Sequence, residues 1–195
     1  MRAFSFAFTF MFLFGLTYVF LAMVDALPEP RGGETQAAVP VPEEIPADTH
    51  ELPVRVVALD IGLDSEVLNP QSTDLDTLNA AVDKAAMRWP TSALLGQDGT
   101  VAIFGHSSHL PIVNNQAYKT FNGIEKLKTG QVISVYSAGI EYRYKVVGVR
   151  LANAEEDVVE LPADGKYLSL VTCDNFGSKS DRYVVTANFE GAYTR

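Results

Sequence analysis

Two stretches near the C-terminus decide the fold of this chain: Tyr167-Leu-Ser-Leu-Val-Thr-Cys173 and Arg182-Tyr-Val-Val-Thr-Ala-Asn-Phe189. Both are rich in β-branched and aromatic residues, and residues 174–181 between them contain Gly and Ser. This pattern predicts an antiparallel pair of strands joined by a loop. Opposed side chains in such a pair have Cβ atoms about 4.5–5.5 Å apart. We therefore expect Cys173 and Arg182 to face each other at one end of the pair.

Cys173 is the only cysteine of the chain, which excludes a disulfide framework and a cysteine-based zinc site. A guanidinium beside a thiol favours the thiolate, the nucleophilic form. The alternative for Cys173 is a small buried apolar residue, a common fate of free cysteine. The alternative for Arg182 is a surface residue at the start of a strand.

The charge and length of the chain limit its function. Its net charge of −9 argues against a nucleic-acid partner, which would require a basic patch. Its 195 residues are enough for one domain with a full core. The three histidines, His50, His106 and His109, form no metal-binding motif, and we expect neither a metal nor another cofactor.

Residues 3–24 form an uncharged, apolar run. A helix of this length spans roughly 33 Å, enough to cross a hydrocarbon core of about 30 Å. Arg2 precedes the run and Asp25 follows it, which predicts a cytoplasmic N-terminus with the rest of the chain outside. We therefore predict residues 1–24 to be a single-pass membrane anchor. The alternative is a cleaved signal peptide, although the run is long for one.

Residues 25–51 differ sharply from this apolar run. They contain five prolines, a Gly-Gly pair, and seven acidic residues against one basic residue. Such a segment cannot bury enough apolar surface to fold. We predict a disordered tether that holds the domain away from a membrane, with His50 as a solvated side chain.

Residues 52–195 have a globular composition and are predicted to form one mainly β domain. A helix is expected from Asp74, a plausible N-cap, to Met87, and helical turns are expected within residues 117–127. Many short strands with few helices predict a closed or nearly closed β-barrel. The expected strands are residues 54–59, 65–68, 101–104, 131–137, 141–151, 167–173 and 182–189.

His106 ends one of these strands and directly follows Gly105. A strand end holds an imidazole in place, and a glycine beside it allows close approach of another group. His109, three residues further on, is less well held and ranks second. A surface or capping role is the alternative for either histidine. A thiol, a histidine and an arginine together are the parts of a cysteine acyltransferase.

These motifs resemble those of the sortase family. Val101-Ala-Ile-Phe-Gly-His106 resembles the strand and Gly-His signature of sortases, and Leu168-Ser-Leu-Val-Thr-Cys173 resembles their Thr-Leu-x-Thr-Cys strand. Arg182 stands where sortases carry their catalytic arginine, and Trp89-Pro-Thr-Ser-Ala93 resembles their approach to the histidine. The likeness extends over residues 52–189 and implies a closed eight-stranded barrel.

Two departures from the family pattern leave the subclass open. Ser169 replaces the first Thr of the cysteine motif, and Ser107-Ser-His109 follows His106 where many sortases have Arg or Thr. We expect Ser107, His109 and Thr172 to contact the substrate.

The resemblance implies a transpeptidase outside the cell. Cys173 would attack a C-terminal sorting signal of the Leu-Pro-x-Thr-Gly type in a secreted protein and form a thioester. His106 would protonate the leaving amine and later act as base. An amine from a cell-wall precursor or a protein lysine would accept the acyl group. Arg182 would stabilise the oxyanion or hold the substrate backbone.

Two other functions remain open at this point. One is a membrane-tethered, catalytically inactive barrel that binds peptide. The other is a cysteine hydrolase that uses water in place of an amine.

Overall fold

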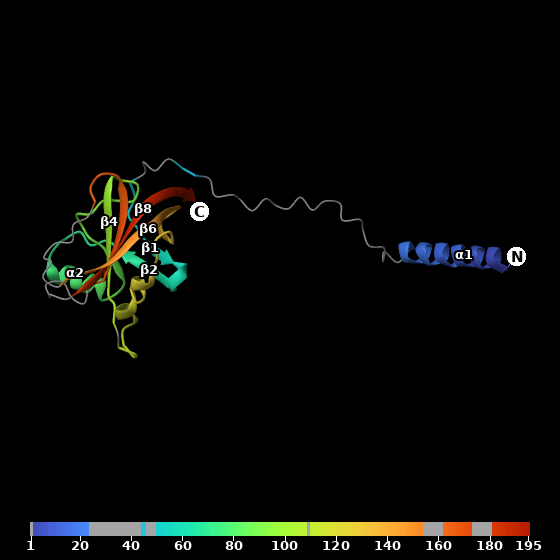
Figure 1. The fold of residues 1–195 in the computed structure, drawn as a ribbon, viewed down its shortest axis with the longest axis horizontal. Coiled ribbons are helices and arrows are strands. Elements are labelled where there is room, and N and C mark those ends of the chain that lie inside the picture. The colour runs from blue at the N-terminus through green and yellow to red at the C-terminus, as the bar shows by residue number, and fades with distance from the viewer. Residues whose placement is uncertain (1, 24–43, 46–49, 109, 154–161, 173–180) are drawn as a thin grey trace. The chain divides into compact units, whose positions relative to one another are not determined.

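The computed structural model of this protein describes residues 2–23, 44–45, 50–108, 110–153, 162–172 and 181–195 (Figure 1). The chain divides into two compact units, residues 1–41 and residues 42–195. Each unit is described separately below.

The first unit contains one helix, α1, which spans Arg2–Met23. Large apolar side chains such as Phe8, Met11 and Phe14 are exposed along it. In the part of the chain that the structure describes, no helix is both long and apolar enough to cross a membrane. The membrane span predicted for residues 3–24 is therefore not confirmed.

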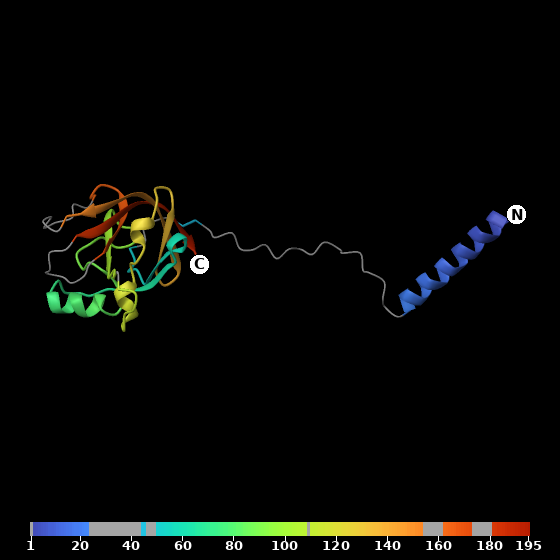
Figure 2. The same cartoon turned by 60° about the horizontal axis from the view of Figure 1, so that its bottom comes forward.

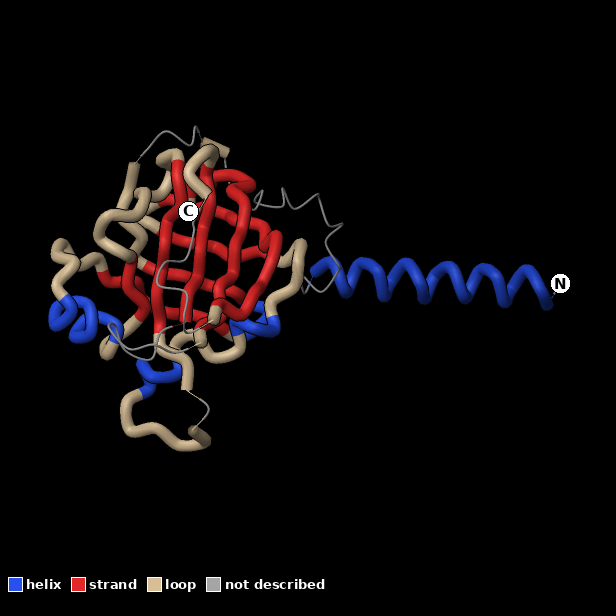
Figure 3. The backbone as a smooth tube through the Cα atoms, turned by 60° about the vertical axis from the view of Figure 1, so that its left-hand side comes forward, coloured by secondary structure: helices blue, strands red, loops and turns tan. Residues whose placement is uncertain are grey.

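The second unit is a closed β-barrel, as the sequence predicted, and its strands are the red segments of Figure 3. The strand order around the barrel is β1-β2-β3-β4-β7-β8-β6-β5. The pairs β2–β3 and β4–β7 are parallel, and the other neighbouring strands are antiparallel. Closure leaves no unpaired sheet edge around the ring. The strands are β1 Arg55–Ala58, β2 Leu63–Leu68, β3 Ala86–Arg88, β4 Gly99–Gly105, β5 Val132–Tyr136, β6 Ile140–Ala152, β7 Lys166–Thr172 and β8 Arg182–Thr194.

Alternating side chains separate the inside of the barrel from its outside. Along β4 and β7, Val101, Ile103, Leu168 and Leu170 belong to the main core, which also contains Tyr144. Burial raises the pKa of the Tyr144 phenol, because the charged form is poorly solvated there. The residues between them point to the other face, as a side-chain period of two requires.

Helix α2, Leu75–Val82, crosses between the parallel strands β2 and β3 outside the barrel (Figure 2). Its N-cap is confirmed, because the Asp74 carboxylate accepts a hydrogen bond from the backbone N–H of Thr77. The prediction that this helix continues to Met87 was wrong. Ala86 pairs with β2 and Met87 with β4, so strand pairing ends the helical pattern.

Short 3-10 turns occupy several connections. Two of them, η2 (Gln116–Lys119) and η3 (Ile124–Lys126), confirm the turns predicted within residues 117–127. A third, η1 (Leu59–Ile61), joins β1 to β2, so the first strand ends one residue before its predicted end. The segment that follows β4, yellow-green in Figure 1, extends away from the barrel.

Two short pieces of the predicted tether contact the barrel. Glu44 forms a bridge with Tyr193, and the N–H of Ile45 donates to the carbonyl of Ala192 at 2.9 Å. Glu51 forms a second bridge with Leu95. Contact with the barrel therefore begins before the predicted domain start at Leu52.

Candidate active site

Three strands place the candidate residues at one edge of the barrel. The parallel strands β4 and β7 both end there, and their last pair is Gly105 with Thr172. Strand β8 runs antiparallel to β7 and therefore begins at the same edge, with Arg182. His106, Thr172 and Arg182 thus lie at one edge although they are far apart in sequence.

The same registers indicate which face of the sheet these side chains share. Phe104, Val171 and Val184 pack together on the outer face, apart from the main core. Arg182 lies two residues before Val184 on β8 and therefore points to that face. His106 comes two residues after Phe104, just beyond the end of β4.

His106 is almost completely buried, with only 3% of its surface exposed. Its Nε2 lies 3.0 Å from Oδ1 of Asp83. The ring of Tyr118 meets the imidazole edge-on, with centroids 5.0 Å apart. The carbonyl of His106 accepts a hydrogen bond from the N–H of Phe121 at 2.8 Å. The contacts with Asp83 and Tyr118 hold the ring in one orientation, and the bond from Phe121 holds the backbone of His106.

Packing explains why glycine precedes this histidine. A Cβ at Gly105 would lie 2.7 Å from the Phe121 ring, closer than real side-chain contacts. Phe121 is fully buried and cannot move aside easily. The close approach that the sequence suggested at Gly105 is therefore made by Phe121.

Polar side chains fasten the loop that follows His106. The N–H of Ser108 donates to Oδ1 of Asn122 at 2.8 Å, and Nδ2 of Asn122 donates to the carbonyl of Ser108 at 2.9 Å. Ser107 is half-buried and lies in the sequence between His106 and Ser108, which Asn122 binds. His109 lies outside the described residues, and its predicted role stays a prediction.

Thr172 joins the end of β7 to the start of β8. It is buried, and its Oγ1 accepts a hydrogen bond from the N–H of Tyr183 at 2.8 Å. This bond connects β7 and β8 beyond their ladder, which is a structural role, and substrate contact by Thr172 stays a prediction. Cys173 lies outside the described residues. In the sequence it directly follows Thr172.

Arg182 is half-buried, and its Nε is enclosed by protein. Among the residues that the structure describes, this Nε has no hydrogen-bond acceptor. Buried donors are nearly always paired, so an unpaired one requires an explanation. The unpaired N–H of Arg182 lies at the edge of the barrel where β4 and β7 end.

Sequence reasoning missed Asp83 and Tyr118. Asp83 fell inside the predicted helix, where a polar residue signals only a solvated face. Its proximity to His106 follows from the end of α2 at Val82, because β3 then runs antiparallel to β4 with Met87 opposite Phe104. No sequence motif marks Tyr118, which lies in the short turn η2.

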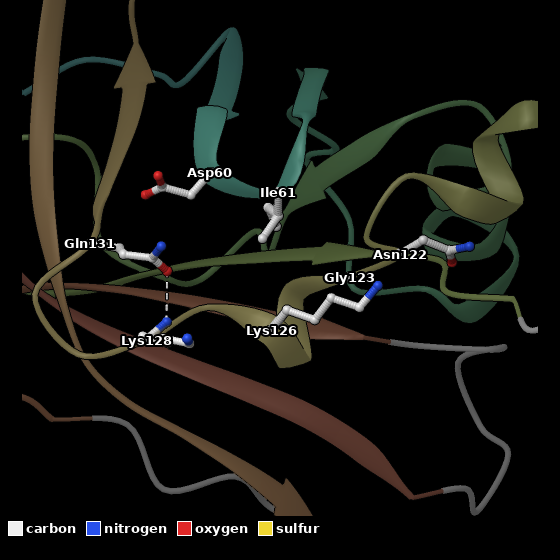
Figure 4. A pocket seen from close by; sticks show the side chains of 7 residues that line it. All are labelled: Asp60, Ile61, Asn122, Gly123, Lys126, Lys128 and Gln131. Atoms are coloured by element: carbon white, nitrogen blue, oxygen red, sulfur yellow. Dashed lines mark hydrogen bonds between the residues drawn. The ribbon is translucent and has the colours of Figure 1, made fainter.

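A separate hollow of about 530 Å³ is lined in part by Asn122, whose side chain also binds the backbone of Ser108 (Figure 4). The side chains of Lys126 and Lys128 line it opposite Asp60. Neither His106 nor Arg182, the two described residues predicted to be catalytic, lines this hollow. Within the described ranges, no cluster of three His, Cys, Asp or Glu side chains is arranged to hold a metal ion.

Comparison with known proteins places this geometry in context. Residues 56–190 match the family described as Sortase domain. A search of curated proteins finds no match. Among solved structures, sortase A from Listeria monocytogenes is 17% identical with a TM-score of 0.55, covering 75% of this chain and 92% of that one.

Two other solved structures are similar. Sortase E from Streptomyces avermitilis is 20% identical with a TM-score of 0.53, covering 75% of this chain and 93% of that one. A sortase D5 transpeptidase from Clostridium perfringens is 23% identical with a TM-score of 0.52, covering 70% and 78%. Identities this low show a shared fold. The family match spans most of the barrel unit, and this chain therefore belongs to the sortase family.

Proposed function

We propose that this sortase cleaves a C-terminal sorting signal through a thioester on Cys173 and transfers the acyl group to an amine. The sortase family consists of cysteine transpeptidases, which supports the reaction class. One observation carries the assignment of residues. A buried His106 and an Arg182 with an unpaired Nε lie at the barrel edge where Thr172, the neighbour of Cys173, ends β7.

The first half of the reaction forms the thioester. The Cys173 thiolate attacks the carbonyl carbon of the scissile peptide bond, and the C–N bond then breaks. The imidazolium of His106 gives a proton to the departing amine, which leaves as a neutral product. The acyl group stays on sulfur while neutral imidazole remains at position 106.

The second half returns the enzyme to its starting state. The incoming amine attacks the thioester carbonyl and loses a proton to the His106 imidazole. The C–S bond breaks, and thiolate and imidazolium are restored. Arg182 donates hydrogen bonds to the oxygen that becomes negative in both halves, and its unpaired Nε supports this role.

The register of the neighbouring strands supports placing Cys173 between these two groups. Val171 pairs with Phe104 on β4 and with Val184 on β8. If both ladders continue by two residues, position 173 falls beside position 106 on one side and position 182 on the other. Opposed side chains in adjacent strands lie within about 5.5 Å at their Cβ atoms.

The test is detection of the covalent intermediate. The full-length chain is incubated with a library of Leu-Pro-x-Thr-Gly-type peptides, and intact mass is measured before and after an oligoglycine amine is added. We expect a mass increase equal to the N-terminal peptide fragment, located on Cys173, and a ligated product after the amine is added. Cys173→Ala is the control and should show neither.

Other outcomes of this experiment separate the alternatives. Turnover to free acid with no ligated product would favour a hydrolase that uses water. Peptide binding without any covalent adduct would favour an inactive binding barrel. Either result would overturn the transpeptidase proposal.

The proposal includes a membrane location, with α1 as anchor and the barrel on the outer face. The large apolar side chains exposed along α1 support it, because apolar surface of this extent requires lipid or a protein partner. Alkaline carbonate extraction of cell membranes should leave the full chain in the pellet, and protease added outside intact cells should cleave the barrel. Release of the full chain into the supernatant would contradict the anchor.

A further inference from the structure

We propose that Asp83 is a positioning residue for His106: its carboxylate accepts the Nε2–H, which leaves Nδ1 as the nitrogen that exchanges protons with the substrate. This inference rests on the proposed function for its kinetic consequences, but the tautomer itself can be tested without any reaction. The Nε2–Oδ1 distance of 3.0 Å is that of a hydrogen bond.

The chemistry of the two groups determines the direction of this hydrogen bond. An ionised carboxylate only accepts hydrogen bonds, so Nε2 must carry the proton. Neutral imidazole has one N–H, and Nδ1 is then the basic nitrogen. When Nδ1 is protonated during the reaction, the same carboxylate stabilises the resulting imidazolium.

The backbone of Asp83 is held on both sides, which makes its carboxylate a fixed acceptor. Asp83 caps the C-terminus of α2, and its N–H donates to the carbonyls of Asn79 and Ala81. Its own carbonyl accepts a hydrogen bond from Nδ2 of Asn115 at 2.6 Å. Asn115 belongs to the segment after β4, so one residue connects helix, histidine and loop.

Because the imidazole is buried, this contact contributes more to its orientation than an ion pair between exposed side chains would. The His106 side chain is 4% exposed, whereas the Asp83 side chain is 42% exposed. The imidazole therefore relies on protein groups for its hydrogen bonds, whereas the carboxylate also contacts solvent. Asp83 faces the imidazole from α2 and Tyr118 faces it from η2. Among the described residues, Arg182 at the start of β8 lies at the same edge, and the proposed function adds Cys173.

The first experiment reads the tautomer by ¹⁵N NMR of ring-labelled full-length protein in detergent micelles. His106 signals are assigned by their loss in His106→Gln. We expect neutral His106 to show a protonated Nε2 and an unprotonated Nδ1. In Asp83→Asn this preference should weaken, because an amide both donates and accepts. A neutral His106 with its proton on Nδ1 in the wild type would overturn the inference, whether or not the chain is a transpeptidase.

The second experiment measures transfer kinetics against pH in matched variants. For Asp83→Asn we expect kcat to fall by about 10- to 100-fold with KM nearly unchanged, because a charge-assisted hydrogen bond is lost from the transition state. Asp83→Glu, which keeps the charge, should recover part of the rate.

Asp76→Asn is the control, because it removes the same charge from an exposed position of the same helix. It should leave both kcat and the pH profile unchanged. Thermal unfolding checks that each variant folds. If Asp83→Asn behaves like Asp76→Asn in rate, pH profile and ring tautomer, Asp83 does not position the histidine. If the wild type shows no transfer at all, the proposed function fails while the NMR result still decides the tautomer.

Discussion

Arg88 and Arg182 are two arginines of the same barrel that differ in how their N–H groups are used. Arg88, on β3, is buried and donates five hydrogen bonds, to Asn69, Trp89, Pro90 and Ser92. The Nε of Arg182, on β8, is buried and has no acceptor among the described residues. The first guanidinium binds its own chain. The Nε of the second has no described acceptor, and we propose that this difference separates a structural arginine from a catalytic one.

The comparison predicts its largest effect at Arg182. Arg182→Lys keeps the positive charge but removes the Nε–H and the planar fork. We expect transfer to fall by about 100- to 1,000-fold, the usual cost of one oxyanion donor, while the melting temperature stays nearly unchanged. Steady-state ligation of a sorting-signal peptide and a thermal melt of the same sample measure both quantities.

Arg150→Lys is the matched control, because Arg150 lies exposed on the adjacent strand β6. It should change neither rate nor stability. A large loss of stability in Arg182→Lys would instead show that Arg182 is a structural residue like Arg88.

The opposite result is expected at Arg88. Burial lowers the pKa of its guanidinium, yet arginine remains protonated at neutral pH. Arg88→Met would leave the carbonyls of Pro90 and Ser92 without this donor, and we expect a loss of about 3 kcal/mol in the free energy of unfolding. Urea unfolding measures this loss.

Activity separates Arg88 from Arg182 more sharply than stability alone. Below the unfolding transition, Arg88→Met should retain most of its transfer rate per folded molecule. If the rate fell as far as in Arg182→Lys, the proposed distinction between the two arginines would be wrong.

Much of the barrel could be predicted because strand periodicity and turn residues are local signals. The ladder between β7 and β8 and the hairpin of β5 and β6 follow from such signals. The end of α2 did not, because Ala85 and Ala86 continue the apolar stripe of a helix. Only the pairing of residues 86–88 with β2 and β4 decides against that helix, and this pairing is non-local.

The same limit applies to the candidate site. His106 and Arg182 were predictable because each stands at the end of a recognisable strand. Asp83 was not, since its contact with His106 depends on where α2 ends. The unpaired Nε of Arg182 depends on the packing of several elements, which composition and spacing do not contain.

Gly105 offers a way to see whether stability and activity can be separated at the site itself. Gly105→Ala would press a methyl group against the buried Phe121 ring. We expect a loss of about 1–3 kcal/mol in the free energy of unfolding, because overpacked cores strain their neighbours. Since Phe121 also donates to the carbonyl of His106, transfer should fall as well.

Phe121→Leu in the Gly105→Ala background makes room for the added methyl group. A recovery of both stability and rate in the double variant would show that packing, and not backbone freedom, requires glycine here. Recovery of neither quantity would contradict this explanation.

Glu141 tests whether a charge satisfied within the chain, like Arg88, affects stability alone. Its carboxylate accepts hydrogen bonds from Arg143 and from Ser134, and the contact with Arg143 is the main reason why the pKa of Glu141 lies below its ordinary value. A lowered folded-state pKa stabilises the protein above the ordinary value, and this contribution is lost as the pH falls through the lowered value. Glu141→Gln should therefore reduce the free energy of unfolding by about 1 kcal/mol at neutral pH and by almost nothing in strong acid. Urea unfolding of the variant at several pH values, with the exposed Glu125→Gln as control, measures the difference.

Equal losses at neutral and acidic pH would show that the effect comes from packing. A pH-dependent loss with an unchanged transfer rate would place Glu141 with Arg88, among the charged residues that stabilise the barrel and take no part in transfer.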